Sequence, residues 1–209
     1  MEKEKMLVTK ALNELKLLDA RINRAIVDGG FVAAAKTAEK KVTPSVTKEE
    51  FTTSALSSYQ SVLDLIERRS KIKSAIVASN ATTEVEVAGE KMTVAEAIER
   101  KTSIDYETKL LRTLKKQFGD AKSTAVTQNV LLEDRIDKYI EAMLGKEAKA
   151  KKDDFAEMIE PIRTANEYSL VDPLKIEEKI NMLSERIENF NSEVDAVLQV
   201  SNCVTWIEF

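Results

Sequence analysis

Residues 176–197 read IEEKINMLSERIENFNSEVDAV, and their apolar side chains recur in steps of four and three. We call this row the C-terminal seam; it consists of Ile176, Ile180, Leu183, Ile187, Phe190, Val194 and Val197. A heptad repeat of this length is typical of a long helix that packs lengthwise against another helix. Asp172 suits the N-cap and Pro173 the first helical position, so we expect a helix over about 173–200. Its partner is a helix of the same chain, which we favour, or a helix of a second copy.

Two upstream segments carry helical stripes of similar length. The first covers about 3–27. The second covers about 48–79 and begins in a capping box formed by Thr47 and Glu50. Its stripe consists of Phe51, Ala55, Tyr59, Val62, Ile66, Ile72 and Ile76. We predict that residues 29–46 form a connector, because glycines and a proline interrupt the helical pattern there.

A further stripe follows residue 93 and is predicted to end near Gly119, because glycine disfavours the interior of a helix. Another helix is expected to start at Thr124 or Ser123 and to continue to about Met143. We interpret residues 120–168 as a helical insertion or extension within a single helical domain that spans the chain. The predicted fold is therefore mainly α, an antiparallel bundle or coiled coil of long helices with one small β-hairpin.

That hairpin is predicted over about 83–93, where TEVEVAGEKMT alternates apolar and polar residues. A two-residue turn at Gly89-Glu90 would place Val87 opposite Met92. A second capping box would then lead directly into the next helix. The residues that define this element are Val85, Val87, Gly89, Met92, Thr93 and Glu96. Because an isolated hairpin is marginal in water, the β-prone tail VTWIEF at 204–209 either adds a third strand to it or packs on the nearest helix.

Composition excludes several classes of function. The chain has no histidine and one cysteine, which removes the commonest general base, intrachain disulfides and multi-thiolate metal clusters. We therefore expect no enzyme activity, no cofactor and no metal. A net charge of −4 gives no broad basic field, so nucleic acid is not an expected partner. Neither a signal peptide nor a membrane span is apparent, which predicts a cytoplasmic protein, in the host cytoplasm if it is phage-encoded.

Several polar residues could form functional sites, and each also has a purely structural interpretation. Arg68, Arg69 and Lys71 could hold an anionic ligand between helices or form a hydrated surface. Asp134, Asp137 and Glu141 share a helical face and could bind a divalent cation, or pair with neighbouring cations. Cys203 near Trp206 could be a reactive thiol, although a packed cysteine is favoured because nothing would activate it. The lysine run KEAKAKKDD at 146–154 suits a solvated helix face better than an anion patch.

The segment RRSKIKSAIVASNATTEVEVAGEKMTVAEAIERK at 68–101 resembles the bacterial DIP1984-like family, some members of which are labelled septicolysin. The resemblance rests on an Ile-x-x-x-Asn motif at 76–80 and a Thr-x-x-Glu-Ala-hydrophobic helix start at 93–98. It extends to 11–22 and 171–199, about half of the chain. It implies a helical bundle or coiled coil with a small β element, and no established reaction. Members are usually shorter, and their tryptophan lies elsewhere in the tail than Trp206.

These features together predict a non-enzymatic, cytosolic interaction or structural protein that self-associates through long helices. A homo-oligomer is the expected assembly, and another protein is a further partner class. The alternative is a protein that binds or sequesters a nucleotide-like or other anionic metabolite, in the setting of a phage or mobile element. An enzyme that uses carboxylate and lysine chemistry is the weakest of the three hypotheses.

Overall fold

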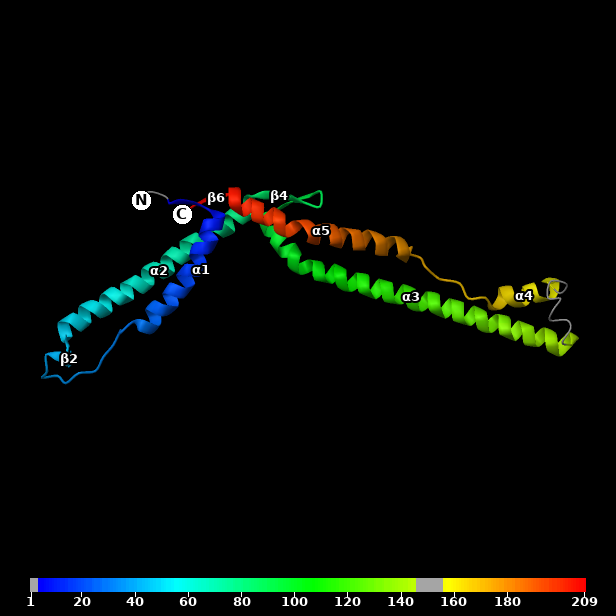
Figure 1. The fold of residues 1–209 in the computed structure, drawn as a ribbon, viewed down its shortest axis with the longest axis horizontal. Coiled ribbons are helices and arrows are strands. Elements are labelled where there is room, and N and C mark those ends of the chain that lie inside the picture. Colours follow the sequence, from blue (N-terminus) through cyan, green and yellow to red (C-terminus); the bar gives the residue numbers. More distant parts are fainter. Residues whose placement is uncertain (1–3, 146–155) are drawn as a thin grey trace. The chain divides into compact units, whose positions relative to one another are not determined.

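The computed structural model describes residues 4–145 and 156–209 and is mainly α-helical, with small antiparallel strand pairs (Figure 1). The helices in these residues are α1 (Val8–Asp28), α2 (Lys48–Thr82), α3 (Val94–Leu144), α4 (Ala156–Asn166) and α5 (Ile176–Val204). The strands are β1 (Lys5–Leu7), β2 (Lys41–Thr43), β3 (Val46–Thr47), β4 (Glu84–Val87), β5 (Glu90–Thr93) and β6 (Trp206–Glu208). The chain, which we predicted to be one helical domain, divides into two compact units. Unit 1 comprises residues 1–102 and 190–209, and unit 2 comprises 103–189.

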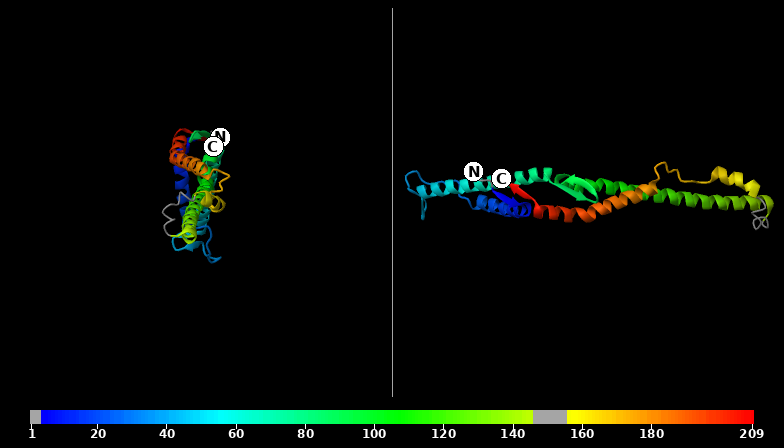
Figure 2. Two further views of the ribbon diagram at one scale, coloured as in Figure 1. Left: turned by 90° about the vertical axis from the view of Figure 1, so that its right-hand side faces the viewer. Right: turned by 90° about the horizontal axis from the view of Figure 1, so that it is seen from above.

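In unit 1, α1 and α2 lie side by side and run antiparallel (Figures 1 and 2). The first turns of α1 meet the last turns of α2 in one apolar core, which consists of Met6, Val8, Ala11, Leu15, Leu18, Ile72, Ile76 and Ile207. This core therefore joins both helices to residues near the two ends of the chain.

The helix predicted from about residue 3 begins only at Val8, because residues 5–7 form β1. This strand pairs with the C-terminal strand β6, with Met6 opposite Ile207. Both of these side chains are buried in the core of unit 1. The expected C-terminal strand thus exists, but it joins β1 and not the hairpin at 83–93. The pairing is favoured because it places both side chains against α2, whereas the outward residues Lys5 and Glu208 form an ion pair at 3.4 Å.

The predicted hairpin is confirmed as β4 and β5, but its turn lies one residue earlier than expected. Val85 pairs with Met92 and Val87 with Glu90, so the loop is Ala88-Gly89. Both loop residues have positive φ, 52° and 76°, as a tight turn matched to the twist of the strands requires. The backbone N–H of Ala88 donates to Glu193 of α5 at 2.7 Å, which anchors the turn. The hairpin side chain that is fully buried is Val87.

A second hairpin overlaps the end of the predicted connector. Strands β2 and β3 pair antiparallel, with Thr43 opposite Val46, so that Pro44 and Ser45 form the turn. The Lys41 ammonium group donates to the Pro44 carbonyl at 3.0 Å. The sequence pattern did not reveal this hairpin, because its strands are only two and three residues long.

Both predicted capping boxes are present, and each lets a strand pass directly into a helix. At the start of α2, the backbone N–H of Thr47 donates to the Glu50 carboxylate at 2.8 Å, and the Glu50 N–H donates to the Thr47 hydroxyl at 3.2 Å. Thr93 and Glu96 repeat this arrangement at the start of α3, at 2.7 Å and 3.2 Å. The donated hydrogen bonds lower the pKa of both glutamates, mainly through the threonine backbone N–H.

These lowered pKa values predict a specific loss of stability in acid. The Glu96 carboxylate stabilises the fold fully above its unfolded value of about 4.5, and this contribution disappears as the pH falls through the lower folded value. We expect Glu96→Gln to lower the melting temperature at neutral pH, and this difference from the wild type to shrink towards pH 3. Circular dichroism melts from pH 7 to pH 3 measure it. Glu86→Gln on the exposed face of β4 is the control, and parallel wild-type and Glu96→Gln curves would contradict the prediction.

Helix α3 continues through Gly119, where we predicted that it would end, and reaches Leu144. A single interior glycine costs only about 1 kcal/mol relative to alanine, which the good helix formers around it offset. Thr124, one of the two predicted starts of the next helix, donates its hydroxyl to the Asp120 carbonyl at 2.8 Å and lies within the same helix. The two predicted helices on either side of Gly119 are therefore one.

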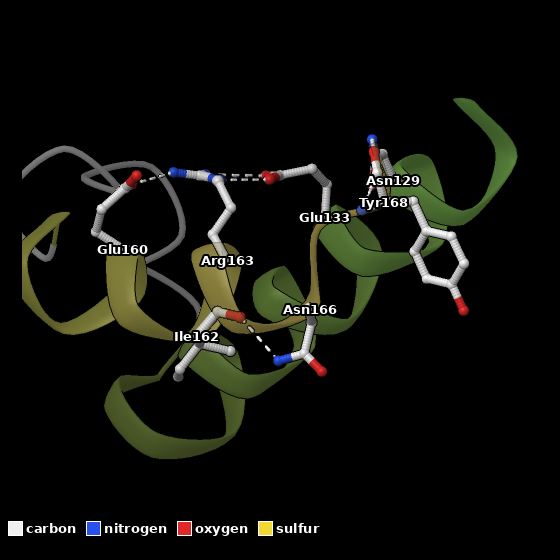
Figure 3. Close-up of polar contacts among 7 residues, drawn as sticks. All are labelled: Asn129, Glu133, Glu160, Ile162, Arg163, Asn166 and Tyr168. Atoms are coloured by element: carbon white, nitrogen blue, oxygen red, sulfur yellow. Dashed lines mark hydrogen bonds and ion pairs between the residues drawn. The ribbon is translucent and has the colours of Figure 1, made fainter. Parts of the chain in front are cut away.

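In unit 2, α4 packs on the last turns of α3 (Figures 1 and 2). Their buried core consists of Leu132, Ile136, Ile140 and Ile159. Figure 3 shows the polar contacts beside it: Arg163 of α4 donates to Glu133 of α3 at 2.8 Å and to Glu160 at 2.9 Å. These carboxylates raise the pKa of Arg163. The Asn129 side chain also exchanges two hydrogen bonds with the backbone of Tyr168, so the chain after α4 is fixed to α3.

Helix α5 begins at Ile176, three residues later than predicted. The Asp172 carboxylate accepts hydrogen bonds from the backbone N–H of Ile176, at 2.9 and 3.0 Å, and from that of Leu174, at 3.3 Å. Lys175 has a positive φ of 53°, which is incompatible with a continuous helix from Pro173. Asp172 therefore stabilises a turn before the helix.

Candidate interaction surfaces

The C-terminal seam packs within the chain. Ile187, Phe190 and Val194 are buried, and the remaining four positions, Ile176, Ile180, Leu183 and Val197, are half-buried. In unit 1, the Arg100 guanidinium of α3 lies 4.7 Å from the centre of the Phe190 ring, and Lys101 forms an ion pair with Asp195. The buried part of the seam is therefore committed to packing within one chain and is not a free surface.

The three cations predicted as an anion site each bind carboxylates of the chain. Arg68 contacts Glu4 through both terminal nitrogens, at 2.8 and 3.0 Å, and donates from Nε to Glu14 at 2.6 Å. Arg69 pairs with Asp19, and Lys71 with Glu67 at 2.7 Å. The Glu4 and Glu14 carboxylates raise the pKa of Arg68, and its hydrogen bond lowers the pKa of Glu4. The structure thus places Arg68 at a contact between α1, α2 and the chain just before β1.

The other polar candidates also lie apart from any assembled site. Cys203 is exposed, and the Thr9 hydroxyl lies 3.5 Å from its sulfur. Trp206 is exposed beside the Lys5 ammonium group, 5.9 Å from the ring centre. Asp134, Asp137 and Glu141 lie on α3, and in residues 4–145 and 156–209 no group of three acidic or cysteine residues is placed to hold a metal ion. The lysine run at 146–154 lies outside the described residues.

Helix α2 presents an exposed apolar row that we call the α2 outer row: Leu56, Tyr59, Leu63 and Ile66. Their exposed fractions are 65%, 55%, 40% and 44%. Tyr59 and Ile66 belong to the predicted stripe of this helix, and both are exposed. Val62, Ile72 and Ile76 of the same stripe are buried, and Leu65 packs against the core shared with α1. Two apolar rows run side by side on α2, one residue apart, so periodicity alone could not decide which of them faces α1.

Charge is missing around the first three residues of the outer row, Leu56, Tyr59 and Leu63. Residues 51–63 read FTTSALSSYQSVL and contain no charged side chain, although charged residues make up 33% of the chain. Phe31, from the extended segment after α1, packs edge-on against Tyr59 with ring centres 6.3 Å apart, and it remains exposed. Interface cores are depleted in charge and enriched in aromatic residues, and exposed patches of this kind mark interaction sites. The uncharged run was the signal in the sequence that would have identified this surface.

Two apolar grooves are further candidate surfaces. In unit 2, an apolar groove of about 410 Å³ lies between α3 and the first turns of α5; we call it the α3–α5 groove. It is lined by Leu110, Leu114, Leu174, Ile176, Lys179, Met182, Leu183 and Arg186. In unit 1, a groove of about 370 Å³ runs between β4 and the end of α5, with Val85, Val197, Val200 and Val204 among its lining residues.

In the part of the chain that the structure describes, no helix combines the length and the apolarity that crossing a membrane requires. Comparisons with protein-family models, with curated proteins and with solved structures find no match to this chain. The resemblance to the DIP1984-like family therefore stays a prediction from the residues quoted above.

Proposed function

We propose that this protein is a non-enzymatic, cytoplasmic interaction module that self-associates through the α2 outer row. The observation that carries the proposal is the uncharged exposed face of α2, in which Leu56, Tyr59 and Leu63 stay accessible in an otherwise highly charged chain. Burying such a row in a helix–helix contact removes apolar area from water, at about 25 cal/mol per Å². The resemblance to a family of helical bundles is compatible with this role.

A second copy of the chain is the partner that this surface fits best. Homodimer interfaces are more apolar than interfaces between transient partners, and an uncharged row offers no charge pattern that would select a foreign partner. The row advances in steps of three, four and three, so its side chains form a ridge that can pack against the same ridge of another copy. A contact between identical faces closes under two-fold symmetry.

The alternative of an anionic-metabolite site at Arg68, Arg69 and Lys71 receives less support. A ligand there would have to compete with Glu4, Glu14, Asp19 and Glu67, which already neutralise these cations. Arg68 also lies 5.7 Å from the Phe209 ring centre, so displacing it would disturb the C-terminal end. These contacts favour a structural role for the three cations.

Light scattering coupled to size exclusion tests self-association. We expect wild-type protein to have a mass that is a multiple of 23.4 kDa, and Leu63→Glu to raise the dissociation constant by about 100-fold or more. The reason is that the variant buries an unpaired carboxylate on each side of an apolar contact. Ser61→Glu adds the same charge to the opposite side of α2 and should leave the mass unchanged. A wild-type protein that is monomeric from micromolar to several hundred micromolar concentration would overturn the proposal.

A further inference from the structure

The α3–α5 groove is an open apolar trough built within unit 2 by one chain. Leu110 and Leu114, one turn apart on α3, form one wall. Leu174, Ile176, Met182 and Leu183 form the other. Met182 is 63% exposed, and Leu110 and Leu174 are also accessible, so three large apolar side chains face solvent around one hollow. A volume of about 410 Å³ falls within the range of small-molecule sites, ~300–1,000 Å³.

Two cations accompany the apolar lining. Lys179 and Arg186 are seven residues apart, which places them on the same side of α5 and about 10 Å apart along its axis. Met182 and Leu183 lie between them on that side. Lys179 forms no ion pair with any residue that the structure describes. The groove therefore combines a hydrocarbon surface with a positive charge at its edge.

This chemistry selects one class of ligand. A nucleotide or a sugar would bring many polar groups against leucine, isoleucine and methionine, where they would lose their hydrogen bonds to water without replacement. A molecule with one anionic head and a hydrocarbon body has no such cost. The α2 outer row of a second copy also fits less well, since it carries no acidic group to meet Lys179. We propose that the α3–α5 groove binds the chain of a fatty acid, with the carboxylate at Lys179.

Calorimetric titration of the full chain with sodium decanoate and with 1-decanol tests this site. We expect saturable binding of one decanoate per chain, and weaker binding of decanol, which lacks the charge. Lys179→Ala should weaken decanoate binding about tenfold, as expected for the loss of one charge-assisted contact. Met182→Glu should abolish it. Lys138→Ala removes an exposed lysine elsewhere on α3 and is the control.

A second measurement locates the ligand. In protein labelled with ¹³C at the methionine methyl groups, decanoate should shift the Met182 signal, assigned through Met182→Leu, and leave that of Met6 in place, because Met6 is buried in the core of unit 1. Equal affinity for decanoate and decanol, or undiminished binding to Met182→Glu, would overturn the proposal. Loss of oligomer mass in Met182→Glu without any decanoate binding by the wild type would also overturn it, and would assign the groove to contact between copies. Decanoate binding by Leu63→Glu is expected to be normal, so this proposal and self-association can fail separately.

Discussion

Replacing Phe190 with alanine is expected to destabilise unit 1 by about 3–5 kcal/mol. The Phe190 ring is 1% exposed, and the Arg100 guanidinium lies over its face at 4.7 Å. The substitution removes both the buried hydrocarbon and the cation–π contact, and it leaves a cavity where α5 packs. Trp206, the one tryptophan of the chain, lies in β6 and reports on unit 1 by fluorescence during urea unfolding.

Two further variants separate the causes of that loss. Phe190→Leu keeps most of the apolar volume and should destabilise unit 1 less than Phe190→Ala. The difference in unfolding free energy between the two variants therefore measures the cost of the cavity. Val200→Ala truncates an exposed side chain of the same helix and should stay within about 0.5 kcal/mol of wild type. A cost below about 1 kcal/mol for Phe190→Ala would show that the ring is not packed as described.

Features set by neighbouring residues could be predicted from the sequence. Both capping boxes need only a threonine and a glutamate three residues apart, and both are present with the expected hydrogen bonds. The seam also follows from local periodicity, which fixes the side of α5 that is apolar. Periodicity does not fix the first residue of a helix, because that residue depends on the local backbone conformation. Helix α5 begins after Lys175, since the positive φ of Lys175 is incompatible with a helix that starts earlier.

Features set by distant residues could not be predicted. The tail at 204–209 was recognised as β-prone, but its partner β1 lies about 200 residues away and is three residues long. A strand that short has no period to detect. What selects the pairing is the joint burial of Met6 and Ile207 in a core that forms only when α1 and α2 are in place.

The exposure of the α2 outer row could not be predicted for a related reason. Val62 and Leu63 are both apolar and adjacent, so α2 has two acceptable buried sides. Tertiary packing chose the side of Val62 and left Leu63 exposed. The absence of charge over 51–63 was visible in the sequence, but it became informative only once that face of α2 was known to lie in solvent.

Replacing Ile72 with alanine is expected to cost about 2–5 kcal/mol and to loosen the β1–β6 pair. Ile72 is 0% exposed and belongs to the core that contains Met6 and Ile207. A pair of three-residue strands is marginal in water, so its stability depends on those two side chains remaining packed against α2. We expect the unfolding midpoint, followed by Trp206 fluorescence, to fall. Amide hydrogen exchange of residues 207 and 209, whose N–H groups face β1 and the residue before it, should accelerate in parallel.

Val77→Ala on the same helix provides the matched control, since Val77 is exposed and its truncation should change neither measurement appreciably. The unfolding midpoint reports on the stability of the core, and amide exchange reports on the pairing of β1 with β6. If Ile72→Ala lowered stability while the amides of 207 and 209 exchanged rapidly in the wild type as well, the helices would form the core without the strands. If the variant cost less than about 1 kcal/mol, the core would not be held by α2 as the structure indicates. Loss of stability together with loss of protection is the result expected if β1 and β6 close unit 1 through the side chains of Met6 and Ile207.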